Sequence, residues 1–280
     1  MPSIEIPQDK REYTKDSSLP LSKCKVGIEI EIENLAEVVL FSKIDGWWTR
    51  KTDGSLRFSG GEIITKPIFG KDIGKALKVF NDALIKGHLP PRHRIISSRT
   101  GVHIHIDFSN TSPEVIFRFL AVYLIIERGL FNFTGNREDN YYCAPLQETN
   151  SLATLGKAAL HPQLFKMFLK GFNKYNALNL GALIKFGTIE LRHLEGTLEH
   201  KKILEWIKVL LSIKRFAIKN RTVPLQEIID RVCLDFEELF AEIIDPQIVP
   251  LNVFWPTIQT AFRDMVEGAR FAQLFMAFND

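Results

Sequence analysis

Cysteine is scarce in this sequence, and no two cysteines stand close together. The 280 residues contain three, Cys24, Cys143 and Cys233, without a Cys-x-x-Cys pair. This number and spacing suit free thiols in a reducing compartment better than a disulfide framework or a zinc knuckle. Cys143 is expected to be a loop thiol and not a nucleophile, because the sequence shows no histidine partner for it.

Long hydrophobic runs and blocks of positive charge are also absent. No apolar stretch has the length of a membrane span or the position of a signal peptide core, so we expect a cytoplasmic protein that binds no membrane. Lys and Arg number 36 against 33 Asp and Glu, a net charge of +3 without a basic block. Nucleic acid is therefore not expected as the main ligand. The sequence does not indicate an oligomeric state.

The chain is long enough to bury a full core, since 45% of its residues are hydrophobic. Residues 1–22 are polar, contain three prolines and show no period, so they are predicted to form a flexible arm. Residues 23–280 are predicted to form one domain, mainly helical from 198 onward. Helices are expected at 71–86, 115–130, 152–170 and about 198–219, the last with Thr197 as its cap.

Acidic and β-branched residues alternate strictly over residues 26–33. A strand would place Glu29, Glu31 and Glu33 on one face and three isoleucines on the other. Carboxylates at this spacing repel one another and are costly to bury, so a cation or basic side chains are expected beside them. The alternative is the solvated face of an edge strand.

Three later stretches repeat the pattern of polar residues on one strand face. They pair Glu62 with Lys66, His103 with His105, and Glu190 with Arg192, whereas His193 is expected on the opposite face. The intervening helices favour one sheet with a charged face. Carboxylates fit Mg²⁺ or Mn²⁺, and arginine and lysine among them indicate an anionic ligand such as a phosphate chain. The histidines could instead be core residues, and Lys66 a surface charge.

Seven motifs in order carry a resemblance to a known family. They are GIEIE, W…DGS, GEIITKP, RTGVHIHID, NREDNYYC, KYNALNL and GTIELRHLEGT. Over about residues 24–215 the chain resembles the amidoligase family, distant relatives of glutamine synthetase and γ-glutamylcysteine synthetase, with phage-encoded members. The resemblance implies an α+β fold in which a curved antiparallel sheet, packed with helices, forms a funnel-shaped active site.

The resemblance also implies roles for individual residues. The metal ligands would be Glu29, Glu31, Glu62, His103 and Glu190. The catalytic residues would be Arg192, His103, Glu62 and Arg137. The nucleotide would be bound by His105, Lys66, Lys174, Asn176, Asn179 and Arg192.

The implied activity is ATP- and Mg²⁺-dependent amide formation through an acyl phosphate, on small-molecule or peptide carboxylates and amines. Residues 137–145 are then a candidate flap that excludes water. Two alternatives remain open. One is a metal-dependent hydrolase or cupin-like metalloenzyme that uses the His-x-His strand without ATP. The other is a non-catalytic nucleotide- or peptide-binding module.

Overall fold

The computed structural model describes residues 24–34, 46–86, 95–135, 137–149, 169 and 172–276. The predicted arm at 1–22 and nearly all of the helix predicted at 152–170 lie outside this range, and both stay predictions, as does the division into arm and domain. The expected mixture of helices with an antiparallel sheet is confirmed for the described residues.

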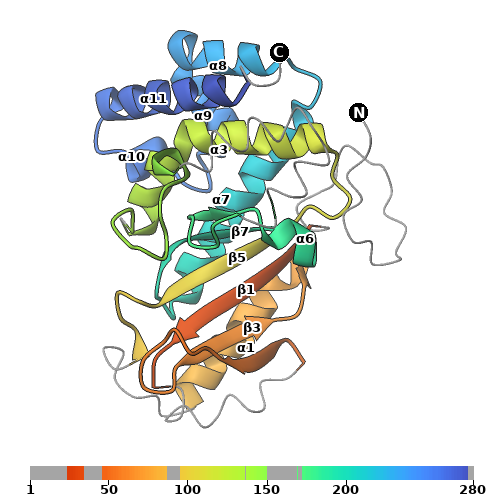
Figure 1. Cartoon of the computed structure of the whole chain (residues 1–280), viewed down its shortest axis with the longest axis vertical. Helices are drawn as coiled ribbons and strands as arrows, with labels where there is room; N and C mark the ends of the chain where they lie inside the picture. Colours follow the sequence, from red (N-terminus) through yellow and green to blue (C-terminus); the bar gives the residue numbers. More distant parts are fainter. Residues whose placement is uncertain are drawn as a thin grey trace.

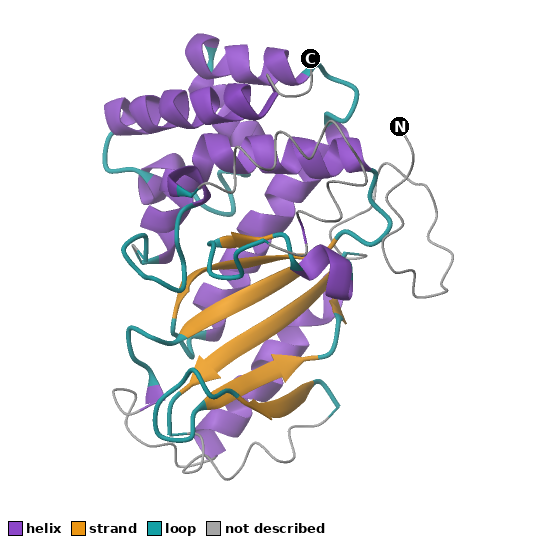
Figure 2. Ribbon diagram, viewed as in Figure 1, coloured by secondary structure: helices purple, strands orange, loops and turns teal. Residues whose placement is uncertain are grey.

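One sheet of seven strands organises the described part of the chain (Figure 2). Its strands are β1 (Lys25–Ile32), β2 (Trp48–Thr52), β3 (Gly61–Thr65), β4 (Ile68–Phe69), β5 (Gly101–Asp107), β6 (Leu178–Asn179) and β7 (Thr188–Glu195). The order is β2-β3-β1-β5-β7-β6, and β4 pairs with the start of β1. Every strand pair is antiparallel, and this order places β1 and β5 at the centre.

The two faces of β1 differ as its alternating sequence predicts. Ile28, Ile30 and Ile32 are buried in the main core cluster. Val102, Ile104 and Ile106 of β5 belong to the same core. Burial of these side chains removes apolar surface from water and fixes which face of each strand turns inward.

Eight helices lie within the described residues. They are α1 (Ile73–Lys86), α3 (Pro113–Thr134), α6 (Ala182–Phe186), α7 (His200–Lys219), α8 (Leu225–Leu234), α9 (Phe236–Ile243), α10 (Leu251–Phe254) and α11 (Ile258–Met276). Short 3-10 turns, Gly70–Asp72 and Leu146–Glu148, precede α1 and follow α3. None of these helices combines the length and the apolar character that crossing a membrane would need.

The long helices lie behind the sheet or beyond it, whereas the short α6 lies in front of it at one end (Figure 1). α1 and α7 lie behind the strands, and the buried Trp48 of β2 joins the sheet to α1 by donating its indole N–H to the Ala76 carbonyl at 2.9 Å. α3 packs on β7 and α7, and α11 crosses α3 on the outside. The other face of the sheet carries no long helix in the described ranges.

Two helix starts test the sequence expectations. α3 begins at Pro113 with Ser112 at its N-cap, two residues before the start predicted at 115. The prediction that Thr197 caps the long helix after β7 is wrong. α7 begins at His200 with Glu199 at its N-cap, and Thr197 Oγ1 instead accepts a hydrogen bond from the Glu199 N–H at 3.1 Å. Thr197 therefore closes a turn with Glu199, directly before the helix begins.

Two glycines give opposite predictions for the stability of this packing. A Cβ atom at Gly268 of α11 would collide with the backbone of Leu124 and Ile125 in α3, whereas Gly74 of α1 has no heavy atom within 4 Å of that position. We expect Gly268→Ala to lower the free energy of unfolding by about 1–3 kcal/mol. Gly74→Ala should raise it by about 0.4–1 kcal/mol, because alanine restricts the unfolded chain. Urea denaturation measures both, and equal effects would contradict the close crossing of α3 and α11.

Candidate functional site

Strand register brings the predicted polar residues onto one face of the sheet. The register pairs Glu29 with His103, Glu31 with Glu62, and His105 with Glu190. These partners come from β1, β3, β5 and β7, the four strands that the alternating pattern singled out. The expected charged face therefore exists, opposite the face that α1 and α7 cover.

Three side chains form what we call the first cluster: Glu29, His105 and Glu190. Each offers one ligand atom, and these atoms lie within 4.8 Å of one another. His105 Nε2 lies 3.2 Å from Glu29 Oε2, and its Nδ1 lies 3.0 Å from the Thr188 hydroxyl. Two carboxylates and an imidazole at this separation are a donor set that a divalent cation accepts.

A second cluster consists of Glu31, Asp53 and Glu62, whose ligand atoms also lie within 4.8 Å of one another. The backbone N–H of Gly101 donates to Glu31 Oε2 at 2.6 Å and fixes that carboxylate. Lys51 Nζ lies 3.4 Å from Glu62 Oε2 on the solvent side. The oxygen-only donor set is typical of Mg²⁺ or Mn²⁺.

His103 lies between the two clusters. Its side chain is buried, with Nε2 at 3.6 Å from Glu31 Oε2 and Nδ1 at 3.4 Å from Glu190 Oε1. Nδ1 makes no hydrogen bond to any residue in the described ranges. An unsatisfied buried polar atom costs free energy, so this nitrogen is suited to a ligand that would complete its contacts.

Burial and mutual repulsion shift the ionisation of the carboxyl groups. Burial raises the pKa of Glu31 to about 7, against the opposing charges of Arg192 and Arg137. Burial and the negative charge of Glu29 raise the pKa of Glu62 to about 8. Burial acts on Glu29 in the same direction, but the hydrogen bond to His105 and the charges of His103 and His105 together outweigh it and hold the Glu29 pKa below its usual range. Without a bound cation, the face therefore retains protons near neutral pH.

The pKa values of the two histidines are also shifted, and in opposite directions. Burial and the nearby Arg192 charge lower the pKa of His103 well below its usual value, so its imidazole is neutral. For His105, burial acts to lower the pKa, but the hydrogen bond to Glu29 and the charge of Glu190 outweigh it and raise the pKa. A neutral imidazole retains the lone pair that metal or hydrogen-bond ligation requires.

Arg192 reaches this face as its alternation with Glu190 predicts, and it lies at an irregularity in β7. The pairing of β5 with β7 shifts register between Val102 and Ile104, which is a β-bulge opposite His103. The Arg137 guanidinium donates to the carbonyls of Arg192 and Leu194 at 3.0 and 3.1 Å and so binds the bulged backbone.

The Arg192 side chain donates in turn to two acceptors. Its Nη1 lies 2.6 Å from Glu190 Oε1, and its Nε donates to the Tyr142 carbonyl at 3.2 Å. The second contact brings the predicted flap segment, residues 137–145, against the charged face.

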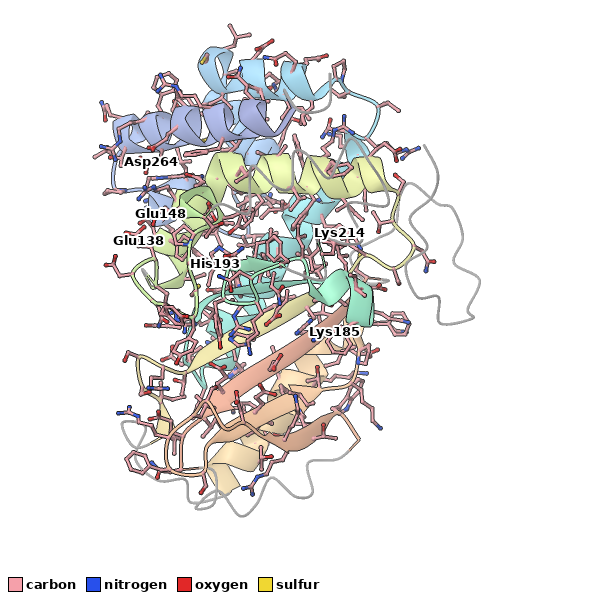
Figure 3. All side chains as sticks on the ribbon, viewed as in Figure 1. Glu138, Glu148, Lys185, His193, Lys214 and Asp264 are labelled. Atoms are coloured by element: carbon pink, nitrogen blue, oxygen red, sulfur yellow. The ribbon has the colours of Figure 1, made fainter. Side chains whose placement is uncertain are left out.

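Two cavities meet at this face. The large cavity, of about 880 Å³, contains the first cluster and four lysines, Lys25, Lys51, Lys174 and Lys185. Lys185, labelled in Figure 3, lies on α6 at one end of the sheet. The small cavity, of about 120 Å³, contains the second cluster and His103. Glu62, Lys174 and Arg192 line both cavities and therefore form their common wall.

The remaining predicted site residues take different positions. Asn179 donates to Glu190 Oε2 at 2.7 Å and lines the large cavity. Lys174 is exposed on the common wall. Asn176 is buried, and Lys66 is exposed just beyond β3. The residues that line the two cavities do not include Asn176, Lys66 or Arg137.

Sequence reasoning missed six residues of the small cavity: Asp53, Ser55, Leu56, Arg99, Tyr142 and Tyr175. The Asp-Gly sequence at Asp53 is typical of a tight turn, and Asp53 does close a turn by accepting the Ser55 N–H at 2.8 Å. A signal for Asp53 does exist in the sequence, because its polar turn joins one strand to the strand that carries Glu62. Arg99 and Tyr142 lie in loops, where no periodic pattern predicts the direction of a side chain.

The opposite face of β7 holds a polar chain that does not reach the cavities. His193, labelled in Figure 3, is buried between the sheet and α3. Its Nε2 lies 3.0 Å from the Tyr123 hydroxyl. That hydroxyl donates to Glu127 Oε1 at 2.6 Å. Burial lowers the pKa of His193 to about 3, so it is a neutral core residue. Its predicted orientation is confirmed.

Comparison with known proteins gives one finding. A family model described as "Putative amidoligase enzyme" matches residues 59–214, more than half of the chain. The matched range includes β3, β5 and β7 but not β1, so the place of Glu29 and Glu31 in the site rests on the sheet register. A search of curated proteins found no match.

The three thiols should differ sharply in reactivity. Cys233 is exposed, whereas Cys24 and Cys143 are buried, and burial raises the pKa of Cys143 to about 12. We expect a disulfide reagent at pH 8 to modify about one thiol rapidly in the native protein and all three after denaturation. Rapid native labelling of Cys143, located by peptide mass spectrometry, would contradict its placement beneath the Arg192 backbone.

Proposed function

The chain belongs to the amidoligase family, and we propose that it is an ATP- and Mg²⁺-dependent ligase that joins a carboxylate to an amine through an acyl phosphate. One observation carries the proposal. Two clusters of metal-ligating side chains lie on one sheet face, and a large and a small cavity meet at that face along a common wall. A glutamine-synthetase-like funnel, open to ATP at one end, would have this arrangement.

The large cavity has the size and charge that a nucleotide needs. Its volume falls within the range of small-molecule pockets. Its lysines would neutralise a phosphate chain, while Phe172 and Ile184 supply apolar surface for a base or sugar. The small cavity is too small for a nucleotide, which leaves it for the group that reacts with the phosphate.

The residues of both clusters fit divalent cations. Their donors are mainly carboxylate oxygens, and the unpartnered Nδ1 of His103 points to a ligand between them. Glu29, His105 and Glu190 would hold one ion, and Glu31, Asp53 and Glu62 the other; Mg²⁺ or Mn²⁺ would supply charge neutralisation at the phosphate oxygens.

Arg192 is the residue best placed to stabilise the transferred phosphoryl group. It lies on the common wall, and its orientation is fixed by Glu190 and the Tyr142 carbonyl. A donor carboxylate oxygen would form a bond to the γ-phosphorus while the bond to the leaving oxygen breaks, and ADP would take that electron pair. Arg192 would stabilise the charge spread over the phosphoryl oxygens.

The amine would then attack the acyl carbon. A carbon–nitrogen bond forms, the carbon–oxygen bond to phosphate breaks, inorganic phosphate leaves, and the nitrogen loses a proton. Water must be kept from the acyl phosphate during this stage. Residues 137–145 are placed to serve as a flap, since Tyr142 contacts Arg192 and lines the small cavity. Arg137 would act as a positioning residue through its bonds to the β7 backbone.

Turnover of ATP tests the proposal. The protein is incubated with Mg²⁺, ATP, pools of amino acids and short peptides, and hydroxylamine as a substitute amine that traps acyl phosphates as hydroxamates. We expect ATP hydrolysis and hydroxamate formation that depend on a carboxylate, stop with a chelator and return with Mg²⁺ or Mn²⁺. Glu29→Ala should lower the rate about 100-fold or more, because it removes a ligand of the first cluster.

The matched control is Glu205→Ala, an exposed glutamate of α7 outside both cavities, which should keep the wild-type rate. Calorimetry that detects no nucleotide binding with either metal would contradict the ligase. A metal-dependent hydrolase built on the first cluster would then be the better account.

A further inference from the structure

A buried glutamate on the back of the sheet takes no part in the reaction just described. Glu127 of α3 is 1% exposed, and no basic side chain of the described residues lies within ion-pair distance of it. Burial raises its pKa to about 7, although the hydrogen bonds that its carboxylate accepts oppose the shift. A buried carboxyl group costs free energy that its hydrogen bonds must offset, so its partners indicate what it does.

Glu127 binds the segment that directly follows the candidate flap, residues 137–145. Its Oε1 accepts the Leu146 N–H at 2.6 Å, and its Oε2 accepts the Gln147 N–H at 3.1 Å. The Gln147 side chain donates in turn to the Leu124 carbonyl of α3 at 2.8 Å. Hydrogen bonds to a carboxylate are stronger than those between neutral groups. The C-terminal end of the flap is therefore fastened to a long helix of the core.

The next residue of α3 also contacts the flap, but only at the surface. Arg128 Nη1 lies 3.5 Å from Glu138 Oε2, and its Nη2 lies 3.6 Å from Glu148 Oε1. Glu138 and Glu148, both labelled in Figure 3, are partly exposed. Water and salt screen ion pairs of this kind, so they contribute little. The buried bonds of Glu127 are therefore the stronger attachment between α3 and this segment.

A short connection joins this attachment to the reacting face. Only residues 143–145 separate Leu146 from Tyr142, whose carbonyl accepts the Arg192 Nε–H at 3.2 Å. Within the connection, the buried Cys143 thiol donates to the Arg192 carbonyl at 3.3 Å, and Pro145 restricts the backbone. A displacement of Leu146 is therefore passed on to Tyr142 and to the guanidinium that Tyr142 orients.

We propose that Glu127 is a positioning residue for the ligase reaction, which acts from behind the sheet by holding the flap through the Leu146 and Gln147 N–H groups. The held flap keeps Tyr142 against Arg192 and keeps water from the acyl phosphate. Glu127 itself lines neither of the two cavities at the charged face. This inference rests on the proposed function, because it takes residues 137–145 to be the flap of a ligase.

Glu127→Gln tests the inference with little change of shape. Glutamine offers one acceptor oxygen where the carboxylate offers two, so one of the two N–H groups loses its acceptor. With Mg²⁺, ATP, hydroxylamine and the amino-acid and peptide pools, the hydroxamate formed per ATP hydrolysed measures how well water is excluded. We expect the variant to lower this ratio about fivefold or more, and to keep its affinity for a non-hydrolysable ATP analogue within about twofold by calorimetry.

The matched control is Tyr123→Phe. It removes the third donor to the same carboxyl group and leaves both bonds to the flap segment in place. We expect it to keep the wild-type ratio. An equal loss in the two variants would mean that Glu127 acts only through the stability of the core, and this result would overturn the inference. A wild-type ratio in Glu127→Gln would overturn it as well.

Amide hydrogen exchange gives a second measurement that needs no turnover. The Leu146 and Gln147 amides should exchange slowly in the wild-type protein, and about tenfold or more faster in Glu127→Gln, while exchange in α11 stays unchanged. Exchange of both amides in the wild-type protein at the rate of an unstructured peptide would overturn the inference, even if the variant did not fold. Absence of ATP turnover by the wild-type protein would instead overturn the proposed function, and the exchange rates would still decide whether Glu127 holds this segment.

Discussion

The repulsion among carboxyl groups on one sheet face governs the arrangement around it. Glu29, Glu31, Glu62 and Glu190 come from three strands and lie within reach of one another, which costs free energy in a partly buried site. His103, His105 and Arg192 offset part of that cost through the contacts described above, and protons on Glu31 and Glu62 offset another part. We propose that divalent ions bound together with phosphate offset the rest of this cost.

The remainder of the chain supports that face from behind. Isoleucines of β1 and β5 pack into the core that α1 and α7 complete, so the strands cannot shift by one residue without burying their carboxylates and exposing the isoleucines. The family match ends at residue 214, within α7, and α8 to α11 lie beyond it. Among these, α11 packs on α3, which carries the His193, Tyr123 and Glu127 chain against the back of β7.

Much of this could be predicted because the strand period is two. Alternation alone placed Glu29, Glu31, His103, His105 and Glu190 on one face and His193 on the other, and the structure has them so. The β-bulge opposite His103 leaves no such trace in the sequence, and it turns Leu194 into the core, whereas strict alternation would place Leu194 on the charged face. Arg99 escaped prediction because its distant partners Ser55 and Tyr142, and not a local period, set its direction. Asp53 lies in a local turn, where it accepts the Ser55 N–H, and a turn carries no strand period that would place its carboxylate on the charged face.

The most direct test of the account is a crystal structure with Mn²⁺ and a non-hydrolysable ATP analogue, with anomalous scattering recorded at the manganese edge. The account predicts anomalous peaks at the first and second clusters, bridged by phosphate oxygens of a nucleotide in the large cavity. Peaks absent from both clusters in crystals that contain the nucleotide, or a nucleotide bound away from the large cavity, would contradict it.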